Sequence, residues 1–236
     1  MDFDLMIDSI PQILGGSRLT VLLVTLSLSM GFVLAVIVAL FRRSKIPMLV
    51  TPIKAFVFVM RGTPLLVQIF LIYYGIAQFE IVRQSIFWSI LKSPFWCAII
   101  ALTLNNTAYG SEIIRGGLES VPWGEVEAAR AYGMSGFLLF RRIIFPIAIR
   151  QALPAYGNEV ILMVKATSLA STITIMEMTG IANTIMAENY RPMEAFIVAG
   201  SFYLLLNFIM TRMIQLIEWQ LSGHLRPPKM SLASTR

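Results

Sequence analysis

The chain has 236 residues, of which 57% are hydrophobic and only 14% are charged, whereas soluble domains average about 45–50% apolar and about 25% charged residues. This composition excludes an ordinary soluble domain, because the apolar residues are gathered into runs long enough to cross a bilayer. The net charge of +6 does not indicate nucleic-acid binding, since basic residues beside membrane spans have another role, which is to set orientation.

Residues 1–18 are predicted to form a periplasmic interfacial segment. Asp2, Asp4 and Asp8 interleave with apolar residues, a pattern typical of a short helix that lies in the membrane interface. We expect a transmembrane domain over residues 19–222 and a cytoplasmic tail over residues 223–236.

Five apolar runs predict an all-α, polytopic membrane protein with five transmembrane helices. A bilayer core about 30 Å thick needs about 20 apolar residues in a helix. The second run is interrupted by Arg61-Gly62-Thr63-Pro64, where proline removes a backbone donor and glycine loosens the helix. The predicted spans are residues 19–41, 53–77, 95–114, 156–178 and 195–217.

Basic residues predict the orientation of the spans. Of the 19 lysines and arginines, 13 fall in loops on one side, 4 fall on the other side, and Arg61 and Lys165 lie within spans. Since cytoplasmic loops carry the excess of positive charge, the N-terminus is expected outside and the C-terminus in the cytoplasm.

The largest predicted cytoplasmic loop covers about residues 116–154. It is too short for an ATP-binding domain, and the chain has no G-x-x-x-x-G-K-[ST] sequence to cradle phosphates. A helix is expected to begin near Pro122 and to stop at Gly133 in a left-handed conformation. A second short helix, capped by Ser135, is expected to end at Pro146. Two short helices joined at a glycine would form an elbow.

The spacing of residues in this elbow resembles the EAA loop of ABC importer permeases. Phenylalanine replaces the family's usual leucine before the final proline. Residues 61–68 resemble the R-G-T-P-L-L-V-Q segment of polar amino-acid permeases, among which histidine, arginine and opine permeases are the most similar. The elbow residues that carry the resemblance are Glu127, Ala128, Ala129, Gly133, Ile143, Phe145 and Pro146.

The resemblance implies a type I ABC importer permease fold and a multi-pass subunit of the bacterial inner membrane. The subunit would move a polar amino acid, preferably a basic one, or an opine. Two permeases, identical or related, would sit on two ABC ATPases that bind ATP and Mg²⁺, and a periplasmic amino-acid-binding protein would deliver the substrate. The permease itself would be no enzyme and would bind no cofactor or metal. ATPase coupling is thereby assigned to Glu127, Ala128, Ala129, Gly133 and Pro146.

Polar residues inside predicted spans are informative because hydrocarbon offers them no partners. An intramembrane ammonium such as Lys165 usually faces a cavity or pathway, whereas a single amide is readily explained by hydrogen bonding between helices. Arg61, beside the helix break, equally suits a binding site or a packing element. The candidate substrate-binding residues are Arg61, Thr63, Gln68, Asn105, Glu112, Glu159, Lys165 and Thr167.

These candidates divide by charge. Lys165 or Arg61 would face the substrate carboxylate, and Glu112 or Glu159 would supply the negative charge that a basic substrate requires.

Two other classes of function compete with an importer permease. An intramembrane enzyme is disfavoured, because the chain has no H-E-x-x-H or G-x-S-x-G sequence and its only histidine, His224, lies in the polar tail. A secondary amino-acid transporter or a channel subunit, uncoupled from any ATPase, is the alternative. Secondary transporters usually carry internal repeats, and five spans cannot be divided into two equal halves.

Overall fold

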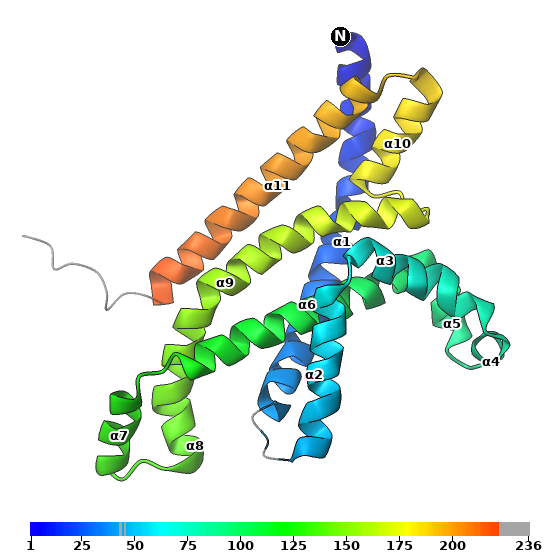
Figure 1. The fold of residues 1–236 in the computed structure, drawn as a ribbon. Coiled ribbons are helices and arrows are strands. Elements are labelled where there is room, and N and C mark those ends of the chain that lie inside the picture. The colour runs from blue at the N-terminus through cyan, green and yellow to red at the C-terminus, as the bar shows by residue number, and fades with distance from the viewer. Residues whose placement is uncertain (43, 45, 222–236) are drawn as a thin grey trace, which may run out of the picture.

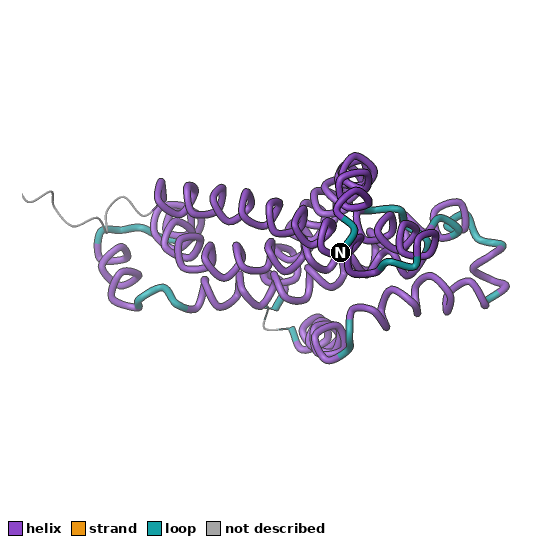
Figure 2. Tube along the Cα trace, turned by 90° about the horizontal axis from the view of Figure 1, so that it is seen from above, coloured by secondary structure: helices purple, strands orange, loops and turns teal. Residues whose placement is uncertain are grey.

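The computed structural model describes residues 1–42, 44 and 46–221, and over these residues it is helical without any strand (Figures 1 and 2). This confirms the predicted all-α class. The predicted tail at residues 223–236 lies outside the described part. The helices are α1 (Phe3–Phe41), α2 (Pro47–Gly62), α3 (Leu65–Phe70), α4 (Glu80–Arg83), α5 (Trp88–Leu91), α6 (Pro94–Glu119), α7 (Trp123–Ala131), α8 (Gly136–Leu139), α9 (Phe145–Ala166), α10 (Met178–Asn189) and α11 (Pro192–Leu221), with π-helical turns at Leu71–Gly75 and Phe140–Ile144 and 3₁₀ turns at Ile76–Gln78 and Thr167–Ile173.

The first helix is longer than the sequence predicted. No boundary separates residues 1–18 from the first apolar run, because α1 continues from Phe3 to Phe41. Its N-terminus is capped by Asp2, whose carboxylate accepts from the Leu5 amide at 3.1 Å. Gly16 allows α1 to lie close to the start of α10, since an added Cβ would stand 2.9 Å from the carbonyl carbon of Glu177, the residue that caps α10. The segment that we expected to be separate is thus the first part of α1, and its residue Ile13 is buried in a cluster with residues of α10 and α11.

The core is built around α6, which packs between α1 and α9. The face of α1 toward α6 carries a buried stripe of small residues at every fourth position, namely Ser27, Gly31, Ala35 and Ala39. A Cβ added at Gly31 would collide with the Asn106 side chain. Small residues permit this close approach of two backbones, which is the usual device for packing helices in membranes.

Two of the described helices, α1 and α11, are long and apolar enough to cross a membrane by themselves, and four spans result if each of two bent pairs is counted as one. The third predicted span corresponds to α6, a helix of 26 residues. It is less apolar than α1 and α11, since Asn105, Asn106 and Thr107 lie at its centre, all buried within the chain. The count of five spans stays a prediction.

In the two bent pairs of helices, the bends lie after α2 and after the 3₁₀ turn that follows α9. The first pair bends by 110° at Thr63, which is extended as residues before a proline tend to be. This is the break expected from Pro64. The second pair bends by 48° after Thr174, which adopts a left-handed φ of 68°. The predicted fourth span is therefore not one straight helix, although its sequence gave no proline to indicate the break.

Candidate functional site

The broken end of α2, the middle of α6 and the end of α9 enclose an open cleft of about 680 Å³. Five of the eight predicted substrate-binding residues line it, although they come from three separate helices. Those five are Arg61, Thr63, Asn105, Glu159 and Lys165.

Two cationic side chains line the cleft, and each lies in the last turn of its helix. Arg61 lies in the last turn of α2 and Lys165 in the last turn of α9, where the partial negative charge of a helix end favours a cation. The guanidinium carbon of Arg61 lies 5.2 Å from the centre of the Tyr109 ring. Among the described residues Lys165 has no ion-pair partner, and its side chain is exposed. Both cations are therefore available to an anion in the cleft.

One carboxylate accompanies the two cations. Glu159 lines the cleft from α9 while only 7% of its surface is exposed. It forms no ion pair with another described residue. A carboxylate this well shielded is costly unless a cation or a hydrogen-bond donor compensates it.

Gln68, another predicted substrate-binding residue, does not line the cleft. It is buried behind the cleft, where its amide nitrogen donates to the Met60 carbonyl at 2.8 Å and to the Thr63 carbonyl and hydroxyl at 3.1 and 2.9 Å. Its amide oxygen accepts from Asn105 at 3.1 Å. These bonds satisfy carbonyls that the break between α2 and α3 leaves without helical partners. The side chain is thus a brace for the break.

Replacing Gln68 with leucine should destabilise the protein, because two partly buried carbonyls, those of Met60 and Thr63, lose their donor, and a net hydrogen bond contributes about 0.5–1.5 kcal/mol. The measurement is thermal unfolding of the purified protein in detergent, expected to show a clear fall in the midpoint. The control is Gln84→Leu, which removes only an exposed bond of 3.1 Å to Glu80. Equal midpoints for the two variants would show that Gln68 does not brace the break.

Two predicted substrate-binding residues lie away from the cleft. Glu112 is engaged by Arg42 and Arg115. Thr167 is fully buried in the 3₁₀ turn after α9, and its hydroxyl donates to the Val164 carbonyl at 2.7 Å. Neither residue lines the cleft, because the sequence gives a residue's depth in a span but not the direction in which it faces, and their part in substrate binding stays a prediction.

Sequence reasoning missed two residues of the cleft, Tyr109 and Ser168. Tyr109 follows Asn105 by four positions and Ser168 follows Lys165 by three, so each shares a helix face with a residue that was predicted. Helical periodicity was the signal that would have found them.

A second candidate site is the elbow formed by α7 and α8. Gly133 adopts a φ of 80°, as predicted, and ends α7 in a Schellman motif. The Met134 amide donates to the Ala129 carbonyl at 3.0 Å, and the Gly133 amide donates to the Arg130 carbonyl at 2.9 Å. A small apolar core of Val126, Ala129 and Leu139 holds the two helices together.

Three details of the elbow differ from the prediction. Ala129 is buried in the elbow's own core, while Ala128 is exposed, so only Ala128 lies on the outer surface. Pro146 does not end a helix, because α8 continues through a π-helical turn into α9, and a wide turn accommodates the missing donor. Gly136 also has a positive φ, of 52°, which the sequence did not reveal.

The outer face of α7 presents an aromatic side chain held between two charges. The Trp123 indole nitrogen donates to Glu127 at 2.7 Å. The Arg130 guanidinium carbon lies 5.3 Å from the centre of the indole ring. Trp123 is 63% exposed, and an aromatic residue oriented in this way is a typical anchor for a protein partner.

Comparison with known proteins gives consistent matches over nearly the whole chain. A family model described as "Binding-protein-dependent transport system inner membrane component" matches residues 31–222. The nopaline transport system permease protein of Agrobacterium fabrum is 55% identical over 227 residues, covering 96% of this chain and 94% of that protein. The histidine/lysine/arginine/ornithine transport system permease protein of Escherichia coli (strain K12) is 42% identical over 213 residues, covering 90% of each.

Solved structures agree with this match. A crystal structure of an amino acid ABC transporter with histidines superposes with a TM-score of 0.83 at 33% identity, over 93% of this chain and 99% of that chain. A methionine ABC transporter in an inward-facing conformation, at 17% identity and a TM-score of 0.73 over 91% of this chain and 98% of that chain, shares the fold.

Proposed function

The chain belongs to the family of binding-protein-dependent transport system inner membrane components and is a permease subunit of an ABC importer for amino acids or opines, and we propose that it binds its substrate in the charged cleft. Permease subunits of this kind are not themselves enzymes. The resemblance found in the sequence and the type I permease fold are thereby confirmed.

The observation that carries the proposal is the set of opposite charges in one cleft. A basic amino acid brings a carboxylate, which Lys165 and Arg61 can receive. Its cationic groups can be received by Glu159, the carboxylate that lines the same cleft. Each substrate charge would then have a partner, which a site shielded from water requires.

The second cation makes the cleft suitable for an opine. Opines are amino-acid derivatives that carry an additional carboxylate, so Arg61 and Lys165 can each receive one. The relative that is 55% identical is a nopaline permease, and the one that is 42% identical carries basic amino acids in its name. We propose a substrate class of basic amino acids and their opine derivatives.

The rest of the importer follows from the family. We propose that the subunit spans the bacterial inner membrane with its C-terminus in the cytoplasm, beside a second, identical or related permease. Two cytoplasmic ABC ATPases would hold ATP and Mg²⁺, and a periplasmic amino-acid-binding protein would deliver the substrate. The elbow of α7 and α8 would contact an ATPase through the exposed face that contains Trp123, Glu127 and Ala128.

Co-purification and uptake test this proposal together. The affinity-tagged chain should bring down an ATPase from detergent-solubilised membranes. Vesicles reconstituted with that complex and its binding protein should accumulate labelled arginine or octopine only when ATP and Mg²⁺ are supplied. Accumulation by the chain alone, driven by an ion gradient without ATP, would instead support a secondary transporter.

A further inference from the structure

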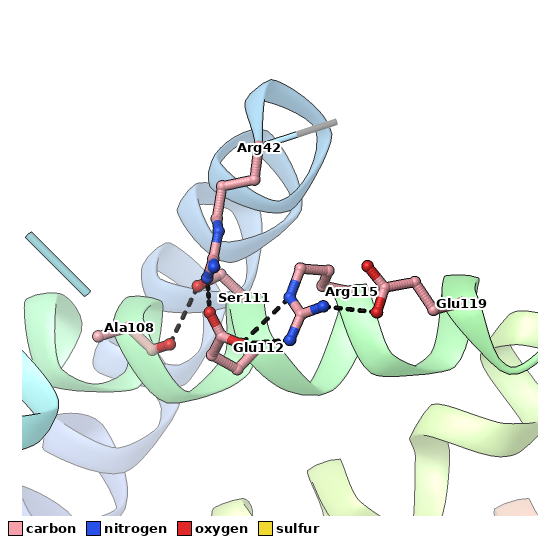
Figure 3. A network of polar contacts seen from close by, with 6 residues as sticks. All are labelled: Arg42, Ala108, Ser111, Glu112, Arg115 and Glu119. Atoms are coloured by element: carbon pink, nitrogen blue, oxygen red, sulfur yellow. Dashed lines mark hydrogen bonds and ion pairs between the residues drawn. The ribbon is translucent and has the colours of Figure 1, made fainter. Parts of the chain in front are cut away.

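Four charged side chains form one network between α1 and α6 (Figure 3). Arg42, which caps the C-terminal end of α1, pairs with Glu112 on α6. The second oxygen of Glu112 accepts from the Arg115 Nε and Nη2 atoms at 3.1 and 2.8 Å. Arg115 in turn reaches Glu119 at 2.5 Å. Positive and negative charges therefore alternate from the end of α1 along α6, and both oxygens of Glu112 are engaged.

The inner part of this network is shielded from water. The side chains of Arg42 and Glu112 are 14% and 16% exposed, whereas that of Glu119 is 62% exposed. Charge pairing strengthens as water is excluded, while exposed pairs contribute little. The contact between Arg42 and Glu112 is therefore the strongest electrostatic contact of the network, and it adds to the packing of Ala35 and Ala39 on α6 at this end.

The network occupies a junction between the elbow and the cleft. On one side, α6 ends at Glu119 and the elbow helix α7 begins at Trp123. On the other side, α2 begins at Pro47, a few residues beyond Arg42, and its far end carries Arg61 into the cleft. A physical connection thus leads from the elbow through α6 and the end of α1 to α2.

We infer that Glu112 is a positioning residue that fixes the end of α1 on α6, so that movement of the elbow is passed through α2 to the cleft. This inference rests on the proposed function, because it explains how the elbow would act on the cleft. Without the pair, the end of α1 and the start of α2 would follow a movement of α6 less closely. Hydrolysis would then continue with little transport.

The first test is Glu112→Gln in the complete importer, reconstituted with its ATPases and binding protein. ATPase attachment should be unchanged, uptake should fall and the ATP consumed per molecule transported should rise about tenfold, within the usual range of coupling between sites. The matched control is Glu188→Gln, an exposed glutamate of α10, which should keep the wild-type ratio. A wild-type ratio in Glu112→Gln overturns the inference.

A second test remains informative even if the loss of Glu112 lowers the amount of protein in the membrane. Arg42→Cys and Glu112→Cys are combined with Cys97→Ala, and the two new thiols are joined by a short bis-methanethiosulfonate that a reductant removes. The joined form should recover the wild-type ratio of ATP to substrate, and reduction should uncouple it again. Equal ratios before and after reduction overturn the inference. Absence of ATP-driven uptake in the wild-type complex would instead refute the proposed function.

Discussion

Replacing Lys165 with methionine should abolish uptake while the ATPases stay bound. Methionine keeps much of the length and apolar surface of the side chain but removes the cation that we propose to face the substrate carboxylate. Without that cation the substrate carboxylate would have lost its partner in the cleft, so uptake of both substrates should be lost. The measurements are uptake of labelled arginine and octopine into vesicles, and co-purification of the ATPase.

The controls for this experiment separate charge from packing. Lys165→Arg keeps the cation and should retain measurable uptake. Lys54→Met makes the same chemical change at an exposed lysine of α2 and should leave transport unaffected. If uptake of every candidate substrate survived Lys165→Met, Lys165 would be a packing residue and the substrate would bind elsewhere.

Gly133→Val and Glu127→Lys should each uncouple ATP hydrolysis from transport. Valine at Gly133 must adopt the left-handed φ of 80°, at a cost of roughly 1–2 kcal/mol for a residue with a side chain, and the Schellman motif that sets the elbow would be lost. Lysine at position 127 removes the acceptor for Trp123 and places a cation near Arg130. We expect normal insertion, weaker ATPase attachment, and uptake reduced about tenfold or more.

Three quantities are measured for the elbow variants: the amount of protein in the membrane, the amount of ATPase that co-purifies, and the ATP consumed per substrate molecule transported. Gly15→Val is the control, because Gly15 lies in α1 with open space around it and an ordinary helical backbone. Transport at the wild-type rate in both elbow variants, at normal membrane levels, would show that the elbow does not couple the ATPases to the spans.

Local features of the fold were predictable because their causes lie within a few residues. Pro64 fixes the break after α2, and Gly133 fixes the end of α7. The prediction for Pro146 failed because a π-helical turn just before it absorbs the missing donor. The left-handed Thr174 had no proline or glycine to indicate it.

The candidate site was predictable in its chemistry but not in its geometry. The depth of Arg61, Glu159 and Lys165 in apolar runs was enough to single them out, and the fold brings all three to one cleft. Gln68 and Glu112 are likewise polar residues in apolar runs, yet their side chains bond to residues that are distant in the sequence, Asn105 and Arg42 respectively. Such contacts depend on how helices rotate against each other, which a single span does not encode.

The two faces of α1 should tolerate mutations to different degrees, because the stripe of small residues lies on only one of them. Outward positions such as Val33 and Ile37 are 58% and 43% exposed, so sequence drift there can exchange one apolar residue for another at little cost. At Gly31 even one additional methyl group would collide with Asn106. In a saturation-mutagenesis library, α1 should therefore show depletion every fourth position along residues 27–39, surrounded by positions that accept most apolar substitutions.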